Sequence, residues 1–206
     1  MSAPAAPRPL LILDCDEVVL RFAAPFREWL RAARGIALRF DSFALVGNMR
    51  HIADGRPVEA TAFPALLEDF FAEGQPLQTP VPGVVEALAQ LGARMDIVCL
   101  SNVPEAHAPI RRAVLASHGL DMPLYANDGG KGRMVRALAA GRRAVFVDDL
   151  PPHHESVARH AAHVGRLHMV ADEELRPLIP AAPMAHARID TWAEAADWIG
   201  NWMEGD

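Results

Sequence analysis

Three carboxylates stand close together near the N-terminus, directly after an apolar run. The stretch LLILDCDEVVL, residues 10–20, carries Asp14, Asp16 and Glu17 behind four apolar residues. Removing a carboxylate from water is costly unless a partner compensates its charge or its pKa rises. Such a cluster is therefore a candidate for nucleophilic or acid–base chemistry, or for binding a cation.

Two further apolar runs also end in polar side chains. Ser101 and Asn102 follow the second run, and Asp148 and Asp149 follow the third. A serine or an aspartate in such a place can also cap a helix, so each pair alone is a weak signal. Taken with the first run, the pattern places oxygen-bearing side chains at the ends of three predicted strands.

Lys131 in the loop NDGGKG is the only lysine of a chain with 20 lysines and arginines. A lysine supplies a compact point charge, whereas the guanidinium group of arginine is broad and planar. The single lysine is therefore a candidate for chemistry that arginine cannot perform. Its alternative role is that of an ordinary surface lysine.

The apolar runs alternate with helical patterns along most of the chain. Runs of this length are typical of buried strands in a parallel sheet, and the alternation predicts a doubly wound α/β fold with right-handed crossovers. The expected strands are 9–13, 95–100, 124–127, 143–147 and 165–170, and the expected helices are 82–91, 104–118, 131–140, 151–163 and 191–203.

Residues 21–79 interrupt this alternation. They show helical stretches around 24–33 and 62–72 and no convincing strand, and the Pro-rich TPVPG then restarts the pattern. We expect two units: a core formed by residues 1–20 and 80–206, and a small helical module, residues 21–79, inserted after the first strand.

In an open parallel sheet, ligands bind at the carboxyl ends of the strands. Four aspartates gathered there would repel one another unless cations lie among them. One lysine and one divalent ion would offset most of this charge, and ligation by oxygen alone favours Mg²⁺.

The order of these motifs resembles that of the haloacid dehalogenase-like hydrolase superfamily. The matching features are DxD after the first strand, a serine after the second, a lysine opening a later helix and an acidic pair after the next strand. The resemblance covers the whole chain, because residues 21–79 stand where this superfamily carries a small helical cap of the C1 type. It implies a Rossmann-like core, and its strength lies in the order of four motifs that are weak singly.

The resemblance also implies a role for each residue. Asp14 would be the nucleophile that forms an aspartyl-phosphate, and Asp16 the general acid and base. The remaining roles would be phosphate binding by Ser101, Asn102 and Lys131, charge neutralisation by Lys131, and Mg²⁺ ligation by Asp14, the backbone carbonyl of Asp16, Asp149 and, directly or from behind, Asp148.

The sequence departs from the family pattern at several places. Glu17 and Val18 stand where glycine and threonine are common, and Glu17 has no evident role. His153 follows the acidic pair and could support the metal site, or simply begin a helix. A zinc site made from His153, His154, His160 and His163 lacks cysteine partners, and GGKG lacks the first glycine and the Ser or Thr of a complete P-loop.

The predicted function is a Mg²⁺-dependent phosphatase that acts on a small phosphorylated metabolite. Asn48, Arg50 and His51 are the candidate substrate contacts in the inserted module. Alternatives are a catalytically silent or regulatory phosphate-binding module and, less favoured because of Asp16 and the acidic pair, a 2-haloacid dehalogenase. A receiver-type signalling domain would have its acidic pair first and its lysine last, and a phosphonate hydrolase would need a lysine in the cap.

Composition narrows the partners further. The net charge of −6 argues against nucleic acid and membrane surfaces, and no apolar run approaches the roughly 20 residues of a membrane span. The N-terminal residues lack the apolar stretch of a signal peptide, and Cys15 and Cys99 are expected as reduced core thiols. We therefore expect a cytoplasmic enzyme, either a monomer or a homodimer.

Overall fold

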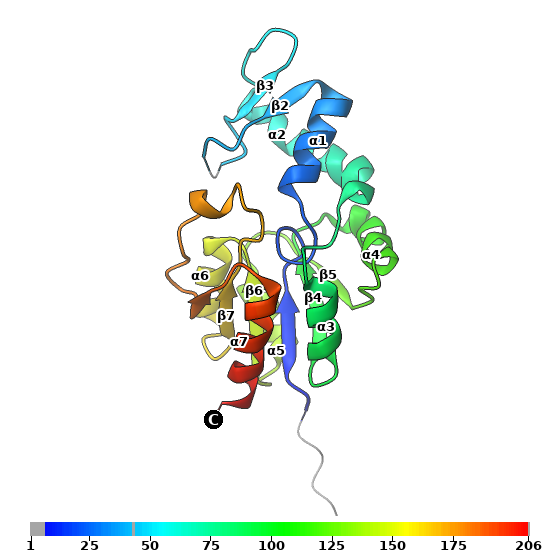
Figure 1. The fold of residues 1–206 in the computed structure, drawn as a ribbon. Helices are drawn as coiled ribbons and strands as arrows, with labels where there is room; N and C mark the ends of the chain where they lie inside the picture. Colours follow the sequence, from blue (N-terminus) through cyan, green and yellow to red (C-terminus); the bar gives the residue numbers. More distant parts are fainter. Residues whose placement is uncertain (1–6, 43, 206) are drawn as a thin grey trace, which may run out of the picture.

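A six-stranded parallel sheet forms the centre of the molecule (Figure 1). The computed structural model describes residues 7–42 and 44–205. The strands lie in the order β5-β4-β1-β6-β7-β8. Their bounds are β1 Leu10–Leu13, β4 Asp96–Ser101, β5 Leu124–Ala126, β6 Ala144–Asp148, β7 Gly165–His168 and β8 Ala187–Arg188. The α/β fold expected from the sequence is confirmed, with β8 as a short additional strand.

Helices cover both faces of the sheet. Because side chains alternate along a strand, Leu11 and Leu13 of β1 belong to one apolar cluster while Leu10 and Ile12 belong to another. The first cluster includes side chains of α3 (Val84–Gly92), α4 (Ala108–Ser117) and α7 (Trp192–Glu204); the second includes those of α5 (Gly132–Ala139) and α6 (Pro151–His160).

From the central strand β1, the chain continues first to one side of the sheet and later to the other side. β1 pairs with β4 on one side and with β6 on the other, and all three run parallel. The loops after these strands therefore diverge at their carboxyl ends, which is where open α/β sheets bind ligands. Asp14, Ser101 and Asp149 all lie at this edge because the strand register aligns Leu13 with Cys99 and Val147.

Residues 21–79, called the insertion below, lie beyond this edge (Figure 1). The insertion contains α1 (Ala23–Arg34), α2 (Phe63–Asp69) and the antiparallel strands β2 (Ile36–Leu38) and β3 (Met49–His51). The expectation that it has no strand is wrong. Three-residue strands are too short to show a period-two pattern, and β2 begins directly after Gly35, whose φ of +61° ends α1.

Aromatic side chains hold the two helical parts of the insertion together. Phe70 lies against Phe26 and Trp29 of α1, with ring centroids 5.2 and 5.7 Å apart in edge-on geometry. Phe70 opens a π-helical turn, Phe70–Gly74, that continues α2. This packing fixes the side of α2 that faces the core.

Among the residues that the structure describes, no helix is both long and apolar enough to cross a membrane.

Candidate active site

Lys131 lies between two aspartates from different strand ends. Its Nζ is 2.5 Å from Oδ1 of Asp14 and 2.8 Å from Oδ2 of Asp148, and all three side chains are buried. Oxygens of Asp14, Asp148 and Asp149 lie within 4.8 Å of one another. One ammonium thus faces three buried carboxylates, which leaves an excess of negative charge.

Burial, together with this excess of negative charge, raises the pKa values of two of the acids. Burial, opposed by Lys131 and reinforced by Asp148, raises the pKa of Asp14 to about 7. Burial and the neighbouring Asp148 and Asp14 raise the pKa of Asp149 well above its usual value. Burial alone would lower the pKa of Lys131, but the two carboxylates outweigh it and raise that pKa. The ammonium therefore stays charged, and the acids lack a second cation.

A close approach of two helices positions Lys131. A Cβ atom on Gly132, the next residue, would collide with the backbone oxygen of Ser156 in α6. The Gly132 N–H also donates a hydrogen bond of 3.0 Å to Ser156 Oγ. Only glycine lets α5 begin this close to α6, so Gly132 belongs to the support of the lysine and not to a P-loop.

The two adjacent aspartates are held differently. Oδ2 of Asp148 accepts from Lys131, and its Oδ1 accepts the N–H of Leu150 at 2.9 Å. Within residues 7–42 and 44–205, no hydrogen-bond donor contacts the Asp149 carboxylate. Asp148 thus anchors the lysine, and Asp149 is the member of the pair with oxygens available for a cation.

Two buried histidines support the backbone of this pair. His154 Nε2 lies 3.0 Å from the carbonyl oxygen of Asp148, and His168 Nε2 lies 2.8 Å from that of Asp149. His168 Nδ1 accepts the N–H of Ala182 at 3.1 Å, so its Nε2 carries the proton that is donated to Asp149. Both rings act as neutral donors that fix the acidic turn.

The neutral state of His154 predicts a loss of stability in acid. Burial, only partly offset by Asp148, lowers its pKa from 6.5 to about 4. The unfolded chain therefore takes up a proton below pH 6.5 that the folded chain refuses, so stability falls between pH 6.5 and 4. This contribution is about 2 kcal/mol at pH 5.

His154→Gln keeps a side-chain N–H donor but does not titrate. Denaturant unfolding at pH 7 and pH 5 should show a smaller acid-induced loss in this variant than in the parent, by about 2 kcal/mol. Equal losses in both proteins would contradict the role assigned to His154.

Asp16 is held by a buried arginine that the sequence analysis did not single out. Arg111 of α4, with a fully buried side chain, donates from Nη1 to Asp16 Oδ1 at 2.7 Å and from Nε to Gln75 Oε1 at 2.6 Å. Gln78 Nε2 donates to the same Asp16 oxygen at 2.8 Å and to the carbonyl of Arg21 at 3.0 Å. Asp16 and Gln78 together therefore connect the core to both ends of the insertion.

Removing this arginine should destabilise the fold. Arg111→Met leaves Asp16 and Gln75 without their buried donor, and we expect the free energy of unfolding to fall by about 2–4 kcal/mol. Arg112→Met, which removes an exposed arginine from the adjacent position of α4, is the matched control and should change it by less than about 0.5 kcal/mol. Similar losses in the two variants would rule out a special role for Arg111.

Glu17 also acquires a role. Its φ of +63° makes it one of two described non-glycine residues with a left-handed backbone, at a turn in which its N–H bonds to the carbonyl of Leu20. Its Oε1 accepts the N–H groups of Phe22 and Ala23 at 2.9 and 2.6 Å, where α1 begins. Burial, partly offset by these bonds, raises its pKa to about 7. Glu17 thus caps the first helix of the insertion.

The carboxyl end of β4 offers hydrogen-bonding groups to a ligand. Ser101 is fully buried, and its Oγ is one of the buried polar atoms that lack a hydrogen-bond partner among the described residues. Asn102 is exposed; its Nδ2 donates to the carbonyl of Gly129, and its Oδ1 accepts from Asn127. These contacts join the loop after β4 to the loop that carries Lys131.

A pocket of about 370 Å³ opens above these groups, between the core and the insertion. Its polar lining consists of Asp14, Asp16, Glu17, Asn102, Lys131, Asp149 and His153. The proposed substrate residues Asn48, Arg50 and His51 are not among its lining. Arg50 and His51 are exposed on β3, and Asn48 Nδ2 bonds to the carbonyls of Ser42 and Ala44.

Asp14, Lys131, Asp148 and Asp149 therefore meet, and Asp16 and Asn102 line the same pocket. Ser101 and the predicted residues of the insertion are not among its lining residues. Sequence reasoning missed Arg111, Gln78 and His168. Arg111 had a readable signal, because it lies on the apolar face of α4 with Ala108 and Leu115, where a charge needs a partner. In the described chain, Asp14, Asp148 and Asp149 are the one set of three potential metal ligands this close together, so the zinc alternative gains no support.

Comparisons with known proteins place the fold. No protein-family model matches the chain, and no curated protein matches it in sequence. Solved structures do match over nearly their whole length. A HAD family hydrolase from Deinococcus radiodurans R1, solved with bound phosphate and sodium, is 19% identical, has a TM-score of 0.63 and covers 96% of this chain and 97% of its own.

Two further structures agree. A HAD-hydrolase from Bacillus subtilis bound to magnesium is 13% identical, with a TM-score of 0.64 and coverage of 94% and 99% of the two chains. A predicted phosphoglycolate phosphatase from Haemophilus somnus is 14% identical, with a TM-score of 0.60 and coverage of 92% and 96%. At these identities the likeness establishes the three-dimensional arrangement. The chain therefore has the fold of the haloacid dehalogenase-like hydrolases.

Proposed function

We propose that the protein is a Mg²⁺-dependent phosphatase that hydrolyses a small phosphate monoester through an aspartyl-phosphate on Asp14. The observation that carries this proposal is the buried set of Asp14, Asp148 and Asp149 around Lys131, at the carboxyl ends of β1 and β6. Phosphoryl transfer needs positive charge around the transferring group and a nucleophile aligned with it. The site supplies the nucleophile and one positive charge.

The residues present fit a divalent cation. Three buried carboxylates face a single ammonium, and oxygen ligands suit Mg²⁺. Asp14 and Asp149 would hold the ion, with the backbone carbonyl of Asp16, while Asp148 holds Lys131. When bound, Mg²⁺ would neutralise charge on the phosphoryl group and polarise it.

The chain's own groups divide the remaining work. Lys131 neutralises the Asp14 carboxylate and a phosphoryl oxygen, while the Ser101 hydroxyl, which has no hydrogen-bond partner among the described residues, donates to another oxygen. Asp14 attacks phosphorus, and Asp16 gives its proton to the departing alcohol and then takes one from the attacking water. Asp16 lines the pocket with 22% side-chain exposure, which supports this role.

The insertion fits the role of a cap. It stands over the strand ends and is joined to the core through Glu17, Gln78 and Asp16. A cap excludes water from the reacting phosphoryl group, which strengthens the electrostatic interactions there.

A phosphate-release assay tests this proposal. Mg²⁺ should support hydrolysis of aryl and alkyl phosphates, chelation should reduce the rate at least about 10²-fold, and Mg²⁺ added back should restore it. Phosphate release that survives chelation would remove Mg²⁺ from the proposal, whereas metal-independent release of halide from a 2-haloacid, without phosphate release from any ester, would favour the dehalogenase alternative. Tight binding of phosphate with no turnover would favour the silent phosphate-binding module.

A further inference from the structure

The walls of the pocket away from Lys131 and the aspartates are apolar. Phe63, Leu67 and Phe71 recur every four residues along α2 and the π-helical turn after it, so they share one face of the helix, and all three line the pocket. The remaining apolar lining residues are Phe22, Ala23, Ala44, Leu45, Val46, Leu150 and Leu175.

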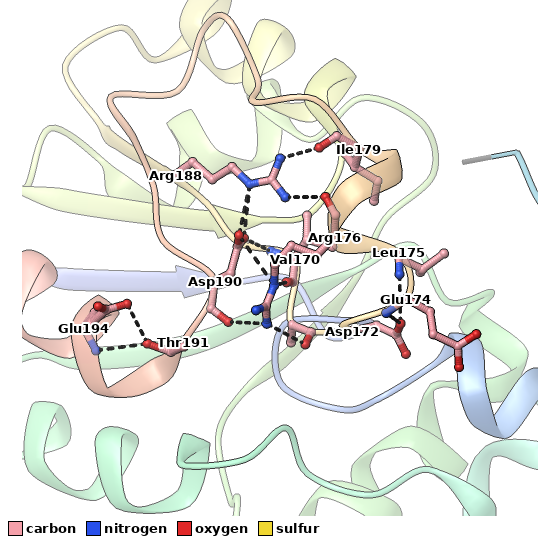
Figure 2. A network of polar contacts seen from close by, with 11 residues as sticks. Val170, Asp172, Glu174, Leu175, Arg176, Ile179, Arg188, Asp190, Thr191 and Glu194 are labelled. Atoms are coloured by element: carbon pink, nitrogen blue, oxygen red, sulfur yellow. Dashed lines mark hydrogen bonds and ion pairs between the residues drawn. The ribbon is translucent and has the colours of Figure 1, made fainter. Parts of the chain in front are cut away.

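The core contributes Leu175 to this wall through a loop that is tied at several points. Oδ1 of Asp172 accepts the N–H groups of Glu174 and Leu175 at 2.8 and 3.0 Å, and Asp190 accepts the N–H of Val170 at 2.9 Å (Figure 2). Further bonds to the carbonyls of this loop come from Arg176 and Arg188. Leu175 is therefore held in place by contacts within its loop and with residues 188–190.

An ion pair joins this loop to the insertion. Glu174, next to Leu175, accepts two hydrogen bonds from Arg27 of α1, at 2.8 and 2.9 Å. The pair is exposed and adds little stability, but it brings the core and insertion walls to the same opening. The apolar surface is thus continuous across the two units.

Positive charge in the pocket is confined to the end where Lys131 and the aspartates lie, which is called the floor below. In the described part of the chain, Lys131 is the one lysine or arginine that lines the pocket, and it already contacts two carboxylates. A second anionic group on a substrate would meet apolar walls without a cation, at a large cost in desolvation. Hydroxyl groups of a sugar would likewise lose hydrogen bonds to water there.

We propose that the leaving group of the substrate is an uncharged, apolar alcohol or phenol, so that the enzyme selects phosphate monoesters with an apolar body. This proposal rests on the phosphatase function proposed above. The floor receives the phosphoryl group, and the walls receive the hydrocarbon.

A series of esters with matched leaving groups tests this selection. Butyl, pentyl and hexyl phosphate should show a kcat/KM that rises about fourfold with each methylene, as burial of one methylene predicts. The phosphate ester of 6-hydroxyhexanoate, in which a carboxylate replaces the terminal methyl group of the hexyl chain, should react at least tenfold less well than hexyl phosphate, as should ribose 5-phosphate. Comparison with 2-phenylethyl phosphate shows whether the walls prefer an aromatic or an aliphatic body.

A charge placed in the wall should reverse the preference. Leu67→Lys should lower kcat/KM for hexyl phosphate and raise it for the carboxylated ester. Ile52→Lys, which puts a lysine on an exposed position of the insertion outside the pocket, should leave the ratio of the two unchanged. A parent enzyme that hydrolyses the carboxylated or sugar esters as well as the hexyl ester would overturn the proposal.

A binding measurement tests the selection for an apolar leaving group independently of the proposed phosphatase function. Hexylphosphonate cannot be hydrolysed, and calorimetry with Mg²⁺ present should show that it binds at least tenfold more tightly than its carboxylated analogue. Absence of phosphate release from every ester would refute the phosphatase function alone. Equal affinity for the two phosphonates would refute the apolar selection alone.

Discussion

Asp14→Asn should abolish phosphate release, with a fall in kcat of at least about 10⁴-fold. The amide cannot attack phosphorus, and it removes one of the three carboxylates around Lys131. The fold should survive, because the substitution is nearly isosteric and relieves a cluster whose burial already raises the pKa of Asp14 to about 7. Steady-state rates and a thermal unfolding curve measure the two effects.

Asp96→Asn is the control for this substitution. Asp96 begins β4 at the opposite end of the sheet and is exposed, so its amide variant should keep full activity. A comparable turnover in the Asp14 variant would remove Asp14 from the role of nucleophile.

Lys131→Met should cost both activity and stability. Three buried carboxylates would then lack their ammonium, and breaking a buried ion pair typically costs about 3–5 kcal/mol. The phosphoryl group would also lose its fixed cation, so we expect kcat to fall on the order of 10³-fold. Unfolding in denaturant and kcat, both measured with saturating Mg²⁺, give the two values.

Arg133→Met removes an exposed cation two residues further along, in the first turn of α5. It should change neither quantity appreciably, because a surface charge in water contributes little. If Lys131→Met were as active and as stable as this control, Lys131 would have no role in catalysis or in stability.

The core site was predictable because it depends on few facts. Apolar runs give the strands, parallel strands bring their carboxyl ends to one edge, and the polar residues that follow must then meet there. Asp14, Ser101 and Asp149 were placed at one edge in this way, and Lys131 was singled out as the only lysine, although all four lie far apart in the sequence. The strands found by this reasoning agree with β1, β4, β5, β6 and β7 to within two residues at every end.

The supporting contacts could not be predicted in the same way. The bond from Arg111 to Asp16 spans 95 residues, and that from Gln78 spans 62. They depend on how α4 and the end of the insertion pack, which no local pattern encodes. The role of Glu17 could not be predicted either, because capping requires the left-handed turn that brings its side chain back to the start of α1.

In the insertion, polarity was a poor guide to the residues that line the pocket. Asn48, Arg50 and His51 drew attention as polar residues, yet β3 carries Arg50 and His51 to an exposed surface. The pocket is instead lined by Phe63, Leu67 and Phe71, whose spacing of four is equally typical of a helix packed into a core. Sequence alone does not distinguish a stripe that meets a core from one that meets a substrate.

The covalent intermediate on Asp14 tests the central claim most directly. An aspartyl-phosphate is reduced by borohydride to homoserine, which mass spectrometry locates in the peptide that contains residue 14. Enzyme quenched during turnover of hexyl phosphate with Mg²⁺ should show homoserine at position 14, and Asp14→Asn or chelated enzyme should not. Phosphate release without this product, or homoserine at another aspartate, would contradict the account.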